Sequence, residues 1–114
     1  MMMTAVALAM AMAAPKADPQ DDARKAFNNC LVEEHNSAVS AKKSGAEFND
    51  QIANACTETR KAYFDIIVRN QKSYGDKQAD AEDYANGEVQ AIIDSITQAF
   101  SDNVGNGAKL EKEK

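Results

Sequence analysis

The segment from Glu47 to Tyr74 constrains the fold more than any other part of the chain. Its apolar residues recur at spacings of three, four and seven, which is typical of one face of an α-helix; they are Phe48, Ile52, Ala55, Cys56, Tyr63, Ile66 and Ile67. Phe64 and Val68 lie outside this stripe, so the predicted helix, over about 46–74, is apolar on more than one side. A helix of this kind is covered by neighbours on two sides. We therefore expect it to lie between two other helices.

The segments on either side of this central helix carry helical patterns of their own. Apolar residues at three- and four-residue spacing predict a helix over about 21–43, before the central one. The clearest amphipathic stripe in the chain predicts a further helix over about 78–104. Asn86-Gly87, within this last helix, is a turn dipeptide. We expect one helix with a weak point there, the alternative being a true break.

Ser44 and Gly45 separate the first two predicted helices. Ser44 and Glu47 match a capping box, and Gly45 suits the left-handed position after a helix. So short a connection makes the two helices antiparallel neighbours. Residues that face each other in such a hairpin share a midpoint, and the midpoint of Cys30 and Cys56 is 43, beside this turn. We predict a disulfide between them, which for a loop of this size stabilises by about 3 kcal/mol.

The predicted fold is therefore all-α. It is a three-helix antiparallel bundle, with helices at about 21–43, 46–74 and 78–104 and one interhelical disulfide between Cys30 and Cys56. The chain of 114 residues is long enough for one domain. Residues 14–20 are expected to form a linker before the bundle domain of 21–104, and residues 105–114 a flexible charged tail.

The first residues of the chain indicate export. Residues 1–13 form an uncharged apolar run that is too short to span a bilayer and ends in Ala11-Met12-Ala13, which matches a signal-peptide cleavage site. A positively charged start is missing, and the alternative is an apolar N-terminus that is buried or disordered. Two cysteines agree with export, because disulfides persist in oxidising compartments. We expect a periplasmic or extracellular protein with no membrane anchor in the mature chain.

The residue types offer little for catalysis or metal binding. His35 is the only histidine, and on a helix it points well away from Cys30, so Cys30, His35 and Cys56 predict no metal site. With Glu33 and Glu34 beside it, we expect His35 to be solvated at the surface. No catalytic triad context, glycine-rich phosphate loop or haem-attachment motif is present. We expect neither enzymatic activity nor a cofactor.

Charge is concentrated on the third predicted helix, where the segment 76–102 carries seven acidic side chains and one lysine. Asp76, Asp80 and Asp83 share a side, but helical carboxylates lack the loop oxygens of a calcium site. We interpret this side as a solvated acidic face, the alternative being a surface for a basic partner or for cations. The net charge of −5 disfavours nucleic-acid binding.

Phe64 and Val68 are the sequence's candidates for a binding surface. Burial under the third helix would account for them. The alternative is a surface for an unknown protein partner or a homodimer, because exposed apolar patches often mark interfaces. We expect a small exported helical protein with a structural or protein-binding role. A carrier of a small apolar ligand between helices is an alternative function, and an enzyme is a further one that the residues support least.

Overall fold

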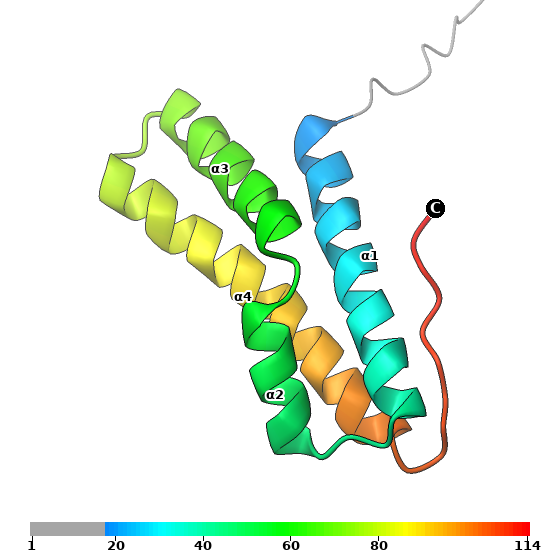
Figure 1. The fold of residues 1–114 in the computed structure, drawn as a ribbon. Helices are drawn as coiled ribbons and strands as arrows, with labels where there is room; N and C mark the ends of the chain where they lie inside the picture. The colour runs from blue at the N-terminus through cyan, green and yellow to red at the C-terminus, as the bar shows by residue number, and fades with distance from the viewer. Residues whose placement is uncertain (1–17) are drawn as a thin grey trace, which may run out of the picture.

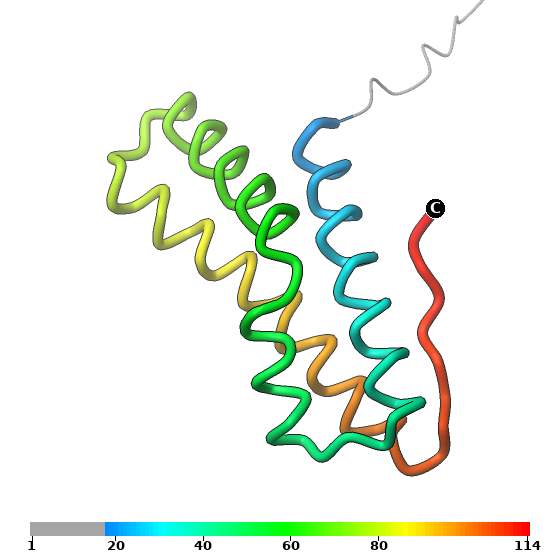
Figure 2. Tube along the Cα trace, viewed as in Figure 1, coloured from blue at the N-terminus to red at the C-terminus, as the bar shows by residue number. Residues whose placement is uncertain are grey.

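The computed structural model describes residues 18–114, which fold into four helices (Figures 1 and 2). They are α1 (Pro19–Ser40), α2 (Gly45–Asn54), α3 (Thr57–Ser73) and α4 (Gln78–Asn103). α2 and α3 run in sequence past α1, and α4 returns along all of them (Figure 1). α1 packs directly against α4 as well as against α3. The predicted signal peptide, 1–13, lies outside the described residues.

The all-helical prediction is confirmed for the described residues, but the count of three helices is wrong. The predicted central helix is interrupted at Ala55 and Cys56. Ala55 has an extended backbone, and Cys56 adopts the left-handed conformation with φ 58° and ψ 35°. α3 begins at the next residue, Thr57.

Apolar periodicity could not reveal this interruption. Ile52 and Tyr63 are buried residues on the two sides of the break, and they are 11 residues apart. Eleven residues of α-helix come within about 20° of three full turns. The apolar stripe therefore stays in phase across the break. A weaker signal was present in the cluster of poor helix formers at Asn54, Cys56 and Thr57.

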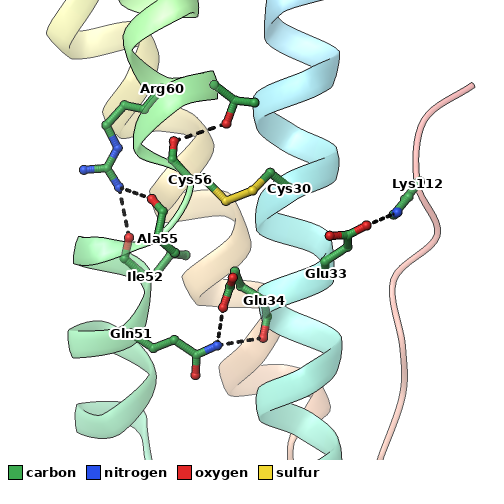
Figure 3. The surroundings of a disulfide bond; sticks show 10 residues. Cys30, Glu33, Glu34, Gln51, Ile52, Ala55, Cys56, Arg60 and Lys112 are labelled. Atoms are coloured by element: carbon green, nitrogen blue, oxygen red, sulfur yellow. Dashed lines mark hydrogen bonds and ion pairs between the residues drawn. A yellow bond between two sulfur atoms is a disulfide. The ribbon is translucent and has the colours of Figure 1, made fainter.

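Arg60 holds the junction between α2 and α3. The last carbonyl groups of a helix have no helical partners. The Arg60 guanidinium takes that place. Its Nη2 donates to the carbonyl oxygens of Ile52 at 2.9 Å and Ala55 at 3.4 Å (Figure 3). Its Nη1 donates to the Ala53 carbonyl oxygen at 3.4 Å. The same group lies 5.9 Å from the centroid of the Phe27 ring, within the range of a cation–π contact.

An Arg60→Lys variant tests this role of the guanidinium. Lysine keeps the positive charge but cannot reach several carbonyl groups with a planar fork. We expect the free energy of unfolding, measured by urea denaturation, to fall by about 1–2 kcal/mol. Lys61→Met is the matched control, because it removes a neighbouring exposed charge and should cost less than about 0.5 kcal/mol. Equal losses in both variants would contradict the proposed cap.

The turn between α1 and α2 is largely as predicted. The capping box of Ser44 and Glu47 is confirmed, with both of its hydrogen bonds present. The left-handed residue, however, is Lys42 with φ 53°, because Gly45 is already the first residue of α2. The backbone N–H of Lys43 donates to the Ala38 carbonyl at 3.1 Å, which closes a Schellman-type end on α1.

Gly75 and Gly87 differ in their backbone roles. Gly75 follows the end of α3 with a φ of 102°, a backbone conformation that favours glycine. α4 continues through Gly87, which confirms the expectation of one helix over this region. A Cβ atom added at Gly87 would meet nothing within 4 Å. Gly87 therefore does not mark a close helix contact.

The core lies where α1, the α2–α3 segment and α4 meet. Its buried side chains come from all four helices: Phe27, Leu31, Val32, Ala38, Val39, Phe48, Ile52, Tyr63, Ile67, Ala85, Val89, Ile96 and Phe100. The rings of Phe48 and Phe100 stack with centroids 4.3 Å apart and planes 6° from parallel. This stack joins the short α2 to the last turns of α4.

Candidate protein-binding surfaces

The predicted disulfide between Cys30 and Cys56 is present. Cys30 lies in the middle of α1, and its Cα is 6.0 Å from that of Cys56. Cys56 is the residue between α2 and α3, so the bond ties α1 to this junction rather than to the interior of a second helix (Figure 3). Neither described cysteine is free. The pair therefore fixes the architecture and supplies no reactive thiol.

Phe64 and Val68 lie one turn apart on α3 and are both partly buried. They contact the edge of the core. They also line an open groove of about 490 Å³ between α3 and the start of α4. α4 thus covers these two side chains only in part. The structure brings the two candidate residues together at one hollow of the surface.

Charged and polar groups surround this groove. The remaining lining residues are Asp65, Arg69, Lys72, Gln78 and Glu82. Asp65 pairs with Lys61 on the exposed side of α3. The groove therefore combines an apolar floor with a rim that carries both signs of charge, at the end of the hairpin that α3 and α4 form.

His35 is fully buried, so the expectation of a solvated histidine is wrong. It follows Phe27 and Leu31 at four-residue spacing on the buried side of α1. This spacing indicates burial, but the prediction relied on the acidic neighbours of His35 instead. The Asn103 side-chain amide donates to His35 Nε2 at 3.2 Å. Nδ1 can then carry the proton and donate to Asn36 Oδ1 at 2.8 Å. His35 thus links α4 to the Asn36 side chain.

Two asparagines of α1 hold the C-terminal segment, 108–114, which runs beside α1 (Figures 1 and 2). Asn36 donates from Nδ2 to the Leu110 carbonyl and accepts from the Leu110 N–H, each at 2.9 Å. Asn29 makes the same pair of bonds with Glu113, at 2.9 and 2.8 Å. The sequence predicts a flexible tail, whereas the structure anchors its backbone at two points. Neither asparagine stood out in the sequence.

Side chains of the segment add further contacts with α1. Leu110 is partly buried and packs against the core. Three charged side chains pair along the helix: Lys109 with Ser40, Lys112 with Glu33, and Glu113 with Arg24. The Arg24 guanidinium makes two hydrogen bonds to the Glu113 carboxylate, at 2.8 and 3.0 Å, and holds the pKa of that carboxyl below its ordinary value.

Figure 3 shows how α1 separates these contacts. Glu34 points toward α2, where Gln51 donates to its carboxylate. Glu33, the preceding residue, points to the opposite side and pairs with Lys112. One side of α1 therefore belongs to the bundle and the other to the C-terminal segment. We call this second side, from Arg24 to Ser40, the outer face of α1.

Metal-binding clusters and membrane-spanning helices are both absent from residues 18–114. Within this range, no cluster of three or more His, Cys, Asp or Glu side chains is placed to hold a metal ion. None of the helices described has the length and apolar character needed to cross a membrane. Comparisons with protein-family models, with curated proteins and with solved structures found no match. The functional proposals therefore depend on the geometry of the groove and of the outer face of α1.

Proposed function

We propose that the protein is an exported, disulfide-stabilised binding module that docks a protein partner in the groove between α3 and α4. The partly open apolar floor of Phe64 and Val68 carries this proposal. Export is supported by the disulfide, which favours an oxidising compartment, and by the apolar run of residues 1–13.

The chemistry of the groove indicates what it would accept. Phe64 offers an aromatic surface, and aromatic residues, Phe among them, are enriched in protein interfaces. Basic Arg69 and Lys72 flank it together with acidic Asp65 and Glu82. A polar rim around an apolar centre is the usual composition of a protein interface. A groove along packed helices suits the apolar side of a partner's amphipathic helix.

Photo-crosslinking in the native host tests the groove. A photoreactive residue in place of Arg69, on the rim, should yield one dominant adduct with a partner protein. Adding Val68→Asp places a charge on the apolar floor and should lower the yield at least about tenfold, because an unpaired charge is costly in an interface. Ile93→Asp is the matched control, since Ile93 is a partly buried residue that lines a separate groove. Its yield should be unchanged.

Three outcomes would contradict the proposal that a protein partner docks in the groove. An adduct that survives Val68→Asp would place the partner elsewhere. Equal loss in Val68→Asp and Ile93→Asp would indicate a general effect on folding. An adduct with the mass of two copies of this chain would make the groove a homodimer interface and not a site for another protein.

Export has a separate readout. The intact mass of the protein purified from its native host should correspond to a chain that lacks residues 1–13. A mass that retains Met1 would overturn the localisation while leaving the crosslinking result to stand on its own.

A further inference from the structure

The spacing of Asn29 and Asn36 matches the repeat of an extended peptide. Seven residues of α-helix advance by about 10.5 Å and return to nearly the same side of the helix. Leu110 and Glu113 are three residues apart, which in an extended chain is about 10 Å. The two asparagines therefore stand in register with every third residue of an extended segment.

Each asparagine recognises backbone rather than side chain. A carboxamide has one acceptor and one donor group, and here both are used on the N–H and C=O of a single residue. This is the pairing that a neighbouring β-strand would offer, and peptide-binding proteins use it widely. The bonds at Leu110 and Glu113 would be the same for any residue other than proline.

The Asn36 amide is set in place from within the core. Its Oδ1 accepts from His35 Nδ1 at 2.8 Å as well as from the Leu110 N–H. His35 is fully buried and is held from its other side by Asn103. A side chain fixed before its ligand arrives loses less entropy on binding. The Asn36 side chain is thus held by α1 and α4, independently of the segment that lies on it.

Side-chain contacts define a sequence preference. The position of Leu110 packs against the edge of the core and favours an apolar residue. Two residues later Lys112 meets Glu33, which favours a basic residue. The next position meets Arg24, which favours an acidic residue.

We propose that the outer face of α1 is a recognition site for an extended segment of a partner protein, with an apolar residue followed at the second and third positions by a basic and an acidic one. The chain's own residues 108–114 occupy this site as an intramolecular competitor. The segment follows the turn at Gly107, where φ is 74°, and Leu110 is its one residue packed against the core. It can therefore leave without unpacking a helix. This site is distinct from the groove between α3 and α4.

Competition by the tethered segment sets the affinity that a partner needs. A short flexible tether gives its end an effective concentration on the order of millimolar. A partner segment must therefore bind the outer face more strongly than the tethered segment does in order to occupy it. Weakening the hold of the tethered segment should therefore open the site to a peptide added in solution.

The test uses the full chain and the synthetic peptide AKLEKEK, which has the sequence of residues 108–114. In a Leu110→Asp variant the tethered segment loses its apolar contact. NMR titration should then show the side-chain amide signals of Asn29 and Asn36 shifting with added peptide. We expect affinity at least about tenfold higher than for the unchanged chain. Unaltered backbone signals from α2 and α3, which share no hydrogen bond with the segment, confirm that the variant is folded.

Two further variants, made in the Leu110→Asp chain, separate recognition from general attraction. Asn29→Asp removes the donor to the peptide carbonyl and should reduce the affinity for the peptide. Both side-chain hydrogen bonds of Asn29 are made to Glu113 of the C-terminal segment, so the substitution breaks no bond within the bundle. Glu33→Lys should also weaken binding, and a peptide with glutamate in place of Lys112 should restore it. Loss and restoration together would show that the peptide lies in the orientation described.

The proposal is overturned if the folded Leu110→Asp chain does not bind the peptide, because the segment would then be only a structural strap. Binding that ignores both Asn29→Asp and Glu33→Lys would overturn it as non-specific attraction. A wild-type dimer that light scattering shows to dissociate on Leu110→Asp substitution would also overturn it, since the occupant would then be the C-terminal segment of a second copy.

Discussion

Phe100→Ala is expected to lower the free energy of unfolding by about 3–5 kcal/mol. Phe100 is 2% exposed. Its ring stacks on Phe48 from α2, with centroids 4.3 Å apart, and lies perpendicular to the His35 ring from α1, with centroids 6.2 Å apart. Alanine would leave a cavity among three helices that are joined at this point.

Urea denaturation followed by circular dichroism measures this loss. Tyr74→Ala is the matched control, because it also removes an aromatic ring, but one that is 79% exposed. The control should change stability by no more than about 0.5 kcal/mol. A Phe48→Ala/Phe100→Ala double variant should lose less than the two single losses combined, because the rings contact each other. A Phe100→Ala loss close to that of the control would contradict the packing described.

Removing the disulfide is expected to have the next largest effect. A Cys30→Ala/Cys56→Ala variant should be less stable by about 3 kcal/mol, because its unfolded chain regains the freedom of a loop of this size. Reduction of the unchanged protein should bring its denaturation midpoint close to that of the variant. A midpoint that stays at the oxidised value would contradict the role of the bond in stability.

A second double variant separates the covalent bond from the backbone at Cys56. A non-glycine residue in the left-handed conformation carries a cost of roughly 1–2 kcal/mol. Cys30→Ala/Cys56→Gly should therefore be more stable than Cys30→Ala/Cys56→Ala, by up to about 1 kcal/mol. If the glycine variant is the less stable one, residue 56 does not keep its left-handed conformation once the bond is absent.

Features encoded by neighbouring residues were predictable from the sequence. The capping box of Ser44 and Glu47 is a local signal, and both of its hydrogen bonds are found in the structure. The disulfide was predictable because the position of the turn fixes which residues face each other across a hairpin. The all-helical fold follows from the same periodicity that gives the core its buried residues.

The break at Cys56 escaped prediction for a geometric reason. The apolar residues of α2 and α3 keep the same helical phase in the sequence, so a pattern with a period of 3.6 residues does not reveal the break between the two helices. The end of α2 depends on Arg60, and a sequence pattern does not reveal which carbonyl groups a long side chain will reach.

The role of the outer face of α1 was even harder to predict from the sequence. Asn29 bonds to a residue 84 positions away in the chain, and Asn36 to one 74 positions away. Two asparagines at a spacing of seven have many possible partners. A short charged C-terminus is usually frayed, so local reasoning favoured a flexible tail. Only the tertiary arrangement brings His35, Asn36 and Leu110 together.

Both cysteines lie in the first half of the chain, which bears on the order in which the protein can assemble. The loop that they close, 26 residues in sequence separation, contains only the second part of α1 and all of α2. Oxidation can therefore join α1 to the end of α2 without any contact from α3 or α4. Contacts close in sequence form early because their loop-closure cost is small. The second half of the chain would then fold onto a hairpin that is already covalently closed, and α4 would complete the core last.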